Sequence, residues 1–120
     1  MAGTEIGWLD EPEDHDYPAA KSYLCLTYEE RKADEYVEKL KKAKVGGFKA
    51  KDIFRASGLS LLGVSNGHVV KDRDKIKGGK KLSPLLLIRD GGRVVVADGY
   101  HRLCAVCSFD EDAVIPCKIV

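Results

Sequence analysis

The segment VVVADGYHRLCAV, residues 94–106, constrains the fold of this chain more than any other stretch. Its first four residues form an apolar run that is typical of a buried strand, and apolar residues return at helical spacing from Leu103 onward. Asp98 and Gly99 stand between the two patterns. The sequence therefore predicts a buried strand that passes directly into a helix, which indicates an α/β architecture with helices packed on a sheet.

Periodicity and turn signals predict the other elements. The expected helices cover residues 28–42, 68–77 and 99–109, and the expected strands cover residues 48–54, 85–88, 94–97 and 114–120, with a loop over 55–67. A capping box of Thr27 and Glu30 is expected to begin the first helix. The second and third strands flank Asp90-Gly91-Gly92, which predicts a hairpin in the middle of the sheet, whereas Pro116 predicts that the last strand lies at or near an edge. The expected fold class is α/β with a mixed, α+β-like sheet.

Length and charge suggest one domain with an acidic segment in front of it. A chain of 120 residues is most simply a single domain. Residues 1–20 contain six acidic side chains and no lysine or arginine, so the rest of the chain carries a net charge of +7. We expect residues 1–20 to form an acidic, poorly ordered leader and residues 21–120 to form the domain. A basic domain attracts phosphate groups of many kinds.

The sequence lacks membrane-spanning and export signals, which favours a cytoplasmic protein with reduced thiols. No apolar run approaches membrane-spanning length and no signal peptide pattern is present, so no membrane partner is expected. Cys104 and Cys107 form a C-x-x-C pair, for which a redox centre and a zinc site are the alternatives to buried core thiols. Cys25 and Cys117 lack the spacing of two further zinc ligands. We therefore expect core thiols and no structural zinc.

The strand-to-helix junction has the chemistry of an anion site. Free backbone N–H groups at a helix start, together with the positive end of the helix dipole, attract anions. Gly99 allows a ligand to approach the backbone, and His101 and Arg102 add donors in the first turn, Arg102 as a bidentate fork. Asp98 is expected either to cap the helix or to face the ligand, as a magnesium ligand or a catalytic base.

The expected basic helix adds cations to this site. His68, Lys71 and Lys75 lie at positions i, i+3 and i+7, and hence on one helix face. Combined with the junction, they predict a phosphate pocket. The alternative is that Asp98 is an ordinary N-cap and that the basic side chains are a solvated surface.

Residues 82–120 resemble the ParB/sulfiredoxin-like domain family. The family pattern is a helix, an apolar strand, a turn, a second strand ending in (D/G)-G-x-(H/R)-R, a further helix and a short final strand. The corresponding motif here is Asp98-Gly99-Tyr100-His101-Arg102, and residues 115–120 close the unit. With residues 48–54 as the family's first strand and 68–77 as its first helix, the resemblance extends over about residues 48–120. It implies a ParB/sulfiredoxin-like fold with a helical N-terminal extension.

Members of this family bind nucleotide phosphates at the motif, with help from the first helix. ParB proteins take CTP, sulfiredoxins take ATP, and a free-serine kinase with a similar motif uses ADP or ATP. The resemblance implies that phosphate oxygens are held by Gly99, His101, Arg102, His68, Lys71 and Lys75. Should magnesium accompany the nucleotide, Asp98 is the candidate ligand for it.

The chain departs from each kind of relative. Tyr100 occupies the position of the reactive cysteine of sulfiredoxins, so sulfiredoxin activity is not expected. The loop over residues 55–67 contains no acid to match the catalytic glutamate of the kinase-like members, unless Asp52 or Asp98 replaces it. Partition proteins carry a helix-turn-helix domain after this one, whereas this sequence ends at Val120, so sequence-specific DNA reading is not expected.

The expected function is therefore the binding of ATP, ADP, CTP or another phosphate ligand at the junction. One alternative is a small phosphotransferase or nucleotide hydrolase that depends on ATP or CTP and uses Asp98 as its catalytic group. The other is a nucleic-acid-binding module of partition or regulatory type, whose contacts would be non-specific because only phosphate contacts are on offer.

Overall fold

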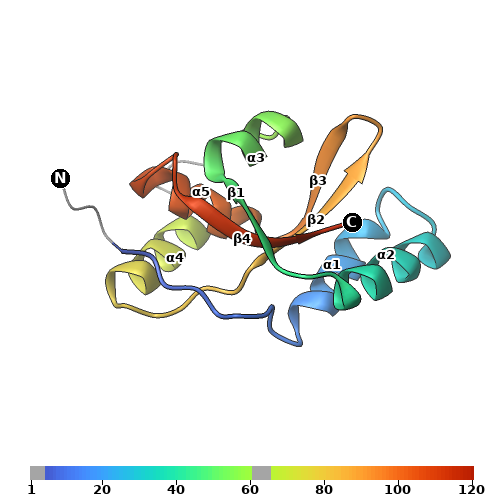
Figure 1. Ribbon diagram of the computed structural model, residues 1–120, viewed down its shortest axis with the longest axis horizontal. Coiled ribbons are helices and arrows are strands. Elements are labelled where there is room, and N and C mark those ends of the chain that lie inside the picture. The colour runs from blue at the N-terminus through green and yellow to red at the C-terminus, as the bar shows by residue number, and fades with distance from the viewer. Residues whose placement is uncertain (1–4, 61–65) are drawn as a thin grey trace.

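The computed structural model of the chain describes residues 5–60 and 66–120, and it has the α/β class with a mixed sheet that the sequence predicts (Figure 1). Its elements in chain order are α1 (Asp16–Leu24), α2 (Glu30–Lys42), β1 (Gly46–Lys49), α3 (Ala50–Ser57), α4 (Gly67–Lys77), β2 (Leu85–Asp90), β3 (Arg93–Asp98), α5 (Tyr100–Phe109) and β4 (Val114–Ile119). The expected helices at 68–77 and 99–109 and the expected hairpin are confirmed within one or two residues.

The four strands are arranged in the order β1-β4-β2-β3. The outer pairs, β1 with β4 and β2 with β3, are antiparallel, and the central pair of β2 and β4 is parallel. One predicted position is therefore wrong: β3 is an edge strand. β4 lies one strand in from the other edge, next to β1, in agreement with a position at or near an edge. Pro116 is tolerated in β4 because the register with β2 begins only at Cys117, which leaves Pro116 paired with β1 alone.

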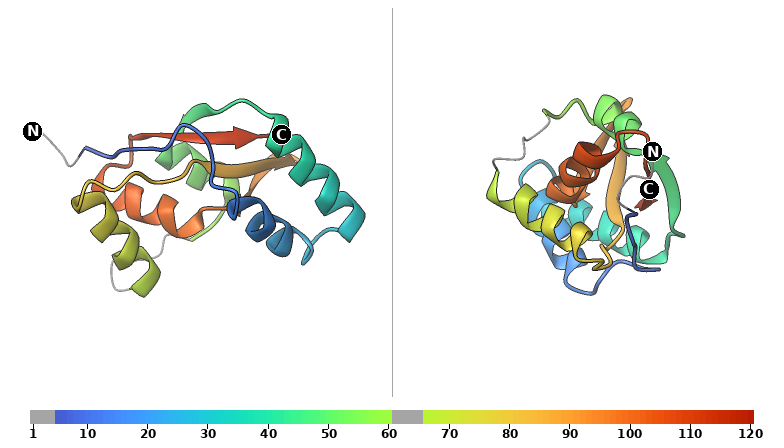
Figure 2. Two further views of the ribbon diagram at one scale, coloured as in Figure 1. Left: turned by 90° about the horizontal axis from the view of Figure 1, so that it is seen from below. Right: turned by 90° about the vertical axis from the view of Figure 1, so that its left-hand side faces the viewer.

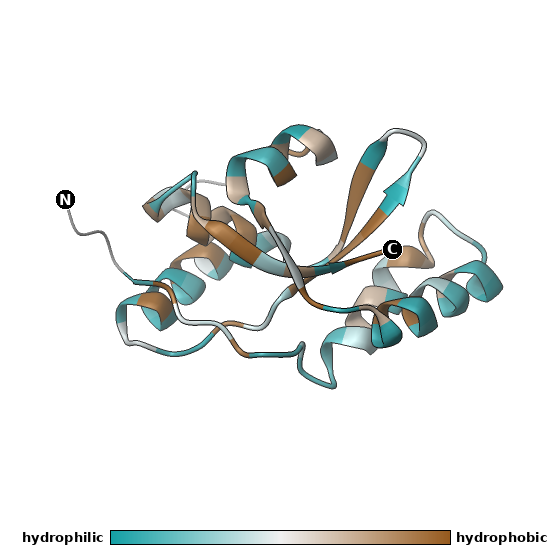
Figure 3. Cartoon of the chain, in the orientation of Figure 1, coloured by the Kyte–Doolittle hydropathy of each residue, from teal (hydrophilic) through white to brown (hydrophobic). Residues whose placement is uncertain are grey.

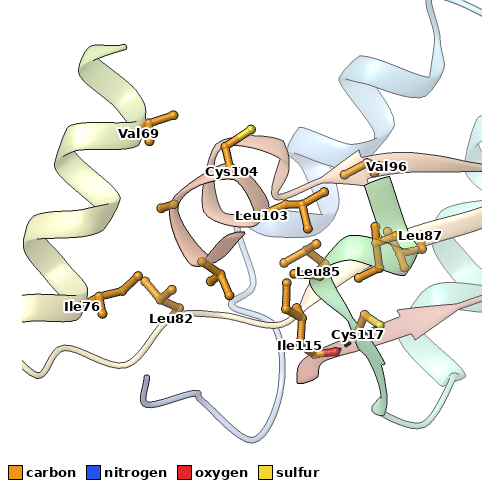
Figure 4. Close-up of a cluster of buried hydrophobic side chains, with 14 residues drawn as sticks. Val69, Ile76, Leu82, Leu85, Leu87, Val96, Leu103, Cys104, Ile115 and Cys117 are labelled. Carbon is orange, nitrogen blue, oxygen red and sulfur yellow. Dashed lines mark hydrogen bonds between the residues drawn. The ribbon is translucent and has the colours of Figure 1, made fainter. Parts of the chain in front are cut away.

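Side chains of the inner strand β2 alternate between two apolar cores. Leu85 and Leu87 belong to the core beneath α3, α4 and α5, which also includes Leu103 and Ile115 (Figure 4). The intervening Leu86 and Ile88 belong to a second core with α1 and α2. Figure 1 shows α4 and α5 on one side of the β2–β3 hairpin and α1 and α2 on the other, and Figure 2 shows the same arrangement from two further directions. Both faces of β2 are thus covered, which explains its continuous apolar sequence.

The outer helix α2 shows the opposite pattern. Most of its residues are hydrophilic (Figure 3), and Ala33, Val37 and Leu40 are its buried residues. This spacing is that of an amphipathic helix with one face on the core.

The predicted strand over residues 48–54 is wrong beyond its second residue. The chain leaves the sheet at Lys49 and forms α3, whose buried residues Ala50, Ile53 and Ser57 recur at helical spacing. The alternation that suggested a strand already fails at Asp52, and burial against the core favours the helix. The predicted loop over 55–67 therefore begins after Ser57; its residues 61–65 lie outside the described part of the chain.

The predicted capping box is also wrong. Helix α2 begins at Glu30, and its N-cap is Glu29, which makes no side-chain hydrogen bond. The backbone N–H groups of Thr27 and Tyr28 both donate to the Leu24 carbonyl, at 3.1 and 2.8 Å. These bonds extend the turn that ends α1, and Thr27 is consequently too far from the start of α2 to cap it.

The expected leader is ordered where it meets the domain. Helix α1 begins at Asp16, a buried residue whose carboxylate accepts a hydrogen bond of 2.6 Å from the Ser83 hydroxyl. Upstream, the Leu9 N–H donates to the Leu82 carbonyl at 2.8 Å. The expectation of loose order is therefore wrong for these residues, because polar contacts tie them to the segment before β2.

A buried lysine holds the same segment from the other side. Lys118, in β4, is 1% exposed, and its ammonium donates to Glu11 at 2.9 Å, to the Tyr17 hydroxyl at 3.1 Å and to the Lys41 carbonyl at 3.1 Å. All three donor positions of the ammonium are used, which accounts for its tolerated burial. In the described part of the chain, no helix has the length and apolarity needed to cross a membrane.

Candidate functional site

The site lies where β3 ends and α5 begins. Gly99 joins them at φ +107°, a backbone conformation that residues with a side chain rarely adopt. A Cβ at this position would stand 2.7 Å from Leu85 Cγ and 2.9 Å from a terminal guanidinium nitrogen of Arg102. Both the conformation and the space therefore require glycine at the junction.

The start of α5 presents backbone donors. The first bond of the helix runs from the Leu103 N–H to the Gly99 carbonyl at 2.9 Å, so the N–H groups of residues 100–102 precede the hydrogen-bonded turns. Gly99 is the N-cap and provides no side-chain acceptor. Helix α4 differs, because its Asn66 side chain accepts from the N–H groups of His68 and Val69, at 3.0 and 3.2 Å. Of these two neighbouring helices, α5 is the one whose first amides are left for another acceptor.

A polar pocket of about 210 Å³ opens beside these amides. It is lined by His68, Lys71, Asp72, Lys75, Asp98, Gly99, His101 and Arg102. All six residues expected to bind phosphate line it, together with Asp98. Helices α4 and α5, which carry most of them, pack against each other (Figure 1).

Asp72 is the pocket residue that the sequence reasoning missed. It lies four residues after His68, on the face already identified for the basic residues, so the helical spacing contained the signal. Its carboxylate is 3.8 Å from the Lys75 ammonium, which it partly neutralises. Lys71 is exposed and has no ion-pair partner among residues 5–60 and 66–120. Lys71 is therefore the pocket lysine with the most charge available for a ligand.

Asp98 and Arg102 form an ion pair within the site. An Arg102 Nη atom donates to Asp98 Oδ2 at 2.9 Å, and the two side chains are only 18% and 17% exposed. Of the two alternatives expected for Asp98, the capping role is therefore wrong, since Gly99 is the N-cap and the carboxylate accepts from the guanidinium instead. Arg102 Nε is buried and has no hydrogen-bond partner within the described residues. The guanidinium thus keeps donor capacity after pairing with Asp98.

Burial raises the pKa of Asp98 above its usual value. The charge of Arg102 and its hydrogen bond oppose this rise, whereas a contact with the carboxyl group of Asp16 adds to it. Asp16 comes from the start of α1, far away in the sequence, and no local pattern indicated its presence beside the motif. Asp16 therefore adds a second carboxyl group to the surroundings of Asp98.

The two pocket histidines lie against each other. Their ring centroids are 4.7 Å apart and the rings are inclined by 37°. Burial lowers the pKa of His101, and the neighbouring His68 and Arg102 lower it further, against an opposing effect of Asp72. The imidazole of His101 is accordingly neutral at physiological pH in the absence of an added anion.

Tyr100 points away from this pocket. Its hydroxyl donates to the Ser60 carbonyl, and burial raises the pKa of the phenol. The residue therefore links the start of α5 to the segment after α3 and does not line the pocket.

The cysteines have different environments. Cys104 and Cys117 are buried in the core beneath α3–α5, Cys107 is half-buried at its margin, and Cys25 is exposed. The prediction of a core thiol is confirmed for Cys104 and only partly for Cys107. Within the described ranges, 5–60 and 66–120, no three histidine, cysteine or acidic side chains are grouped so as to hold a metal ion.

The chain matches no protein family, no curated protein and no solved structure in comparisons of sequence and fold.

Proposed function

We propose that this protein binds a phosphate-bearing ligand, a nucleotide such as ATP, ADP or CTP, in the pocket between α4 and α5. The observation that carries the proposal is the pairing of uncapped α5 amides with the cations of the facing α4 helix in one pocket. A phosphate at this position would accept from the N–H groups of residues 100–102 and from Arg102, with Lys71 as a further cation. The ParB/sulfiredoxin-like resemblance of the motif supports the same ligand class.

The pocket has room for the phosphate end of a nucleotide. Its volume of about 210 Å³ and its charged lining suit phosphate groups, and the base and sugar would extend toward the open side. When magnesium accompanies the nucleotide, Asp98 and Asp72 are the carboxylates that would contact it, since this cation prefers oxygen ligands and shares them with phosphates.

Turnover of the nucleotide is a second candidate function, favoured by a largely buried carboxyl group in the pocket lining, that of Asp98. The pKa of Asp98 is raised by burial, as is typical of a carboxyl group that accepts a proton during catalysis. The hydrogen bond from Arg102 holds this carboxylate in the pocket. Hydrolysis or phosphoryl transfer would then use Asp98 to accept the proton of the attacking hydroxyl group.

Isothermal titration with ATP, ADP, CTP and inorganic phosphate, each with and without magnesium, tests the proposal. We expect binding that is lost or weakened in Lys71→Ala and retained in Lys77→Ala, an exposed lysine of the same helix that does not line the pocket. A charge-assisted contact to phosphate contributes about 1.5–3 kcal/mol, so Lys71→Ala should lose roughly tenfold or more in affinity. Equal effects of the two substitutions would overturn the assigned site.

Phosphate release by the wild-type protein and by Asp98→Asn then separates binding from turnover. Release that depends on Asp98 supports the enzymatic candidate. Binding without release leaves the protein as a nucleotide-binding module. Salt-sensitive binding of any oligonucleotide, with no binding of mononucleotides, would instead favour the nucleic-acid alternative.

A further inference from the structure

We propose that the free edge of β3 binds an extended segment of another polypeptide, one that carries an acidic side chain. This surface is separate from the phosphate pocket, because the two sites share no lining residue. The proposal rests on the direction of the strand's backbone groups, on a groove along the strand, and on an arginine at its end.

The hydrogen bonds of β2 establish which of its residues face β3. The Arg89 N–H donates to the Val120 carbonyl at 2.8 Å, and the Val120 N–H donates to the Leu87 carbonyl at 3.2 Å. Leu87 and Arg89 therefore direct their backbone groups toward β4. Because successive residues of a strand alternate in direction, Ile88 directs its groups toward β3.

The register then determines which backbone N–H and C=O groups of β3 have no partner in β2. Ile88 is the partner of Val95, so these two residues exchange hydrogen bonds. Val94 and Val96 consequently direct their N–H and C=O groups outward, and the residues that the structure describes supply no partner for them. Outward-facing donors and acceptors on an edge strand are the template for pairing with another extended chain.

The outward groups lie in a groove of about 240 Å³. One wall consists of Tyr23, Thr27 and Tyr28, from α1 and the turn after it, and the other of Ser57 and Leu59, at the end of α3. Figure 1 shows the β2–β3 hairpin between these two parts of the chain. Tyr23 is 45% exposed and Leu59 is 37% exposed, so each wall presents apolar surface to an incoming side chain.

Arg93 gives this groove a preference for acids. It is exposed at the hairpin end of the groove, and its side chain makes one long contact, 3.5 Å to the Ser57 carbonyl. Asp90, which also lines the groove, accepts instead from the Tyr28 hydroxyl. Within the described ranges no carboxylate forms an ion pair with Arg93, so its charge is available to an acidic side chain of the bound segment.

The walls also select against a second copy of this chain. In a dimer through β3, each protomer would bring its own pair of walls against the groove of the other. A linear segment has no such walls and enters the groove from solvent. The occupant is therefore an extended stretch of a different polypeptide, which adds to the sheet as a fifth strand.

Amide hydrogen exchange tests the proposal with the acetylated, amidated peptide EVTVTVE, which reads the same in both directions and so places an acid near Arg93 in either orientation. In the protein alone, the Val95 N–H should exchange slowly, and the Val94 and Val96 N–H groups should exchange rapidly. At millimolar peptide, exchange at Val94 and Val96 should slow at least tenfold while Val95 stays as it was. A fully N-methylated copy of the peptide should give no protection.

Two substitutions complete the test. Arg93→Ala should abolish the preference for EVTVTVE over its glutamine analogue, whereas Arg89→Ala, an exposed arginine outside the groove, should keep it. Val94→Pro removes one outward donor without touching the β2–β3 ladder and should weaken binding. The proposal is overturned if the peptide leaves Val94 and Val96 unprotected, or if both amides already exchange slowly in dilute protein alone. It is also overturned if their protection grows with protein concentration in the absence of peptide, because that result would indicate pairing with a second copy of the chain.

Discussion

Arg102 and Asp98 are joined across one turn at the start of α5, with 2.9 Å between a guanidinium nitrogen and a carboxylate oxygen, and less than one-fifth of either side chain is exposed. This pair fixes a cation beside the first amides of the helix. Arg102 therefore contributes to the stability of the fold as well as to the pocket. A solvent-exposed guanidinium would contribute to ligand binding alone.

Arg102→Ala should therefore lower both stability and ligand affinity. Its removal leaves Asp98 partly buried without its charged partner, at a cost of about 1–3 kcal/mol in the free energy of unfolding. The double variant Arg102→Ala/Asp98→Ala should recover part of this cost, with a coupling of about 0.5–3 kcal/mol in urea unfolding. Strictly additive effects of the two substitutions would show that the pair does not contribute to stability.

Gly99→Ala should destabilise the protein more than substitutions at other glycines. The positive φ of residue 99 adds strain of about 1–3 kcal/mol, and the contacts of the new Cβ with Leu85 and Arg102 add to it. Gly79→Ala isolates the strain, because φ there is +76° with no atom within 4 Å of a Cβ. Gly67→Ala, at the start of α4 with open space and an ordinary φ, serves as the neutral control. Thermal unfolding of the three variants should rank them in that order.

Cysteine labelling should follow burial. Cys25 is exposed and should react first with a disulfide reagent. Burial raises the pKa of Cys107, and it raises the pKa of Cys117 to about 11, so few thiolates are present at neutral pH. Native protein should therefore show one fast thiol, absent in Cys25→Ser, and the others should react after denaturation. Rapid native reaction of Cys104 and Cys107 as a pair would indicate a redox centre instead.

Anion affinity should rise as the pH falls toward 6. The pKa of His101 lies below its ordinary value of 6.5 because of burial and the adjacent His68. A bound anion stabilises the imidazolium form, so binding takes up a proton and is stronger where protons are abundant. Sulfate is a suitable probe because it remains a dianion across this range. His101→Gln should flatten the dependence of the sulfate dissociation constant on pH.

The same lowered pKa of His101 determines how the stability of the protein changes with pH. A histidine whose pKa is lower in the folded state than in the unfolded state binds fewer protons when folded. Its contribution to stability is therefore lost as the pH falls below 6.5, and sulfate should restore part of that loss in the wild-type protein.

Residues of the pocket were predictable because their signals are local. The glycine, histidine and arginine of the junction are consecutive or nearly so, and the spacing of His68, Lys71 and Lys75 follows directly from helix geometry. Asp16 contacts Asp98 through the tertiary packing of α1 on β3, and such a contact cannot be predicted from local sequence spacing.

The errors in the fold have a related cause. Sheet order depends on which distant strands pair, and local sequence does not record it. The sequence of β3 is apolar, like that of a central strand, because helices pack on it although it lies at the edge of the sheet. The short segment at Ala50 has apolar residues compatible with both periods, and packing of Ile53 on the core decides for the helix.

The place where an anion binds is measured most directly by amide chemical shifts during titration with ATP and with sulfate. We predict that the largest shifts fall on the N–H groups of Tyr100, His101 and Arg102 with both ligands, and that Lys71→Ala weakens both titrations while Lys77→Ala does not. Shifts confined to the basic end of α2, at Lys39, Lys41 and Lys42, or no shifts at millimolar ligand, would contradict the account.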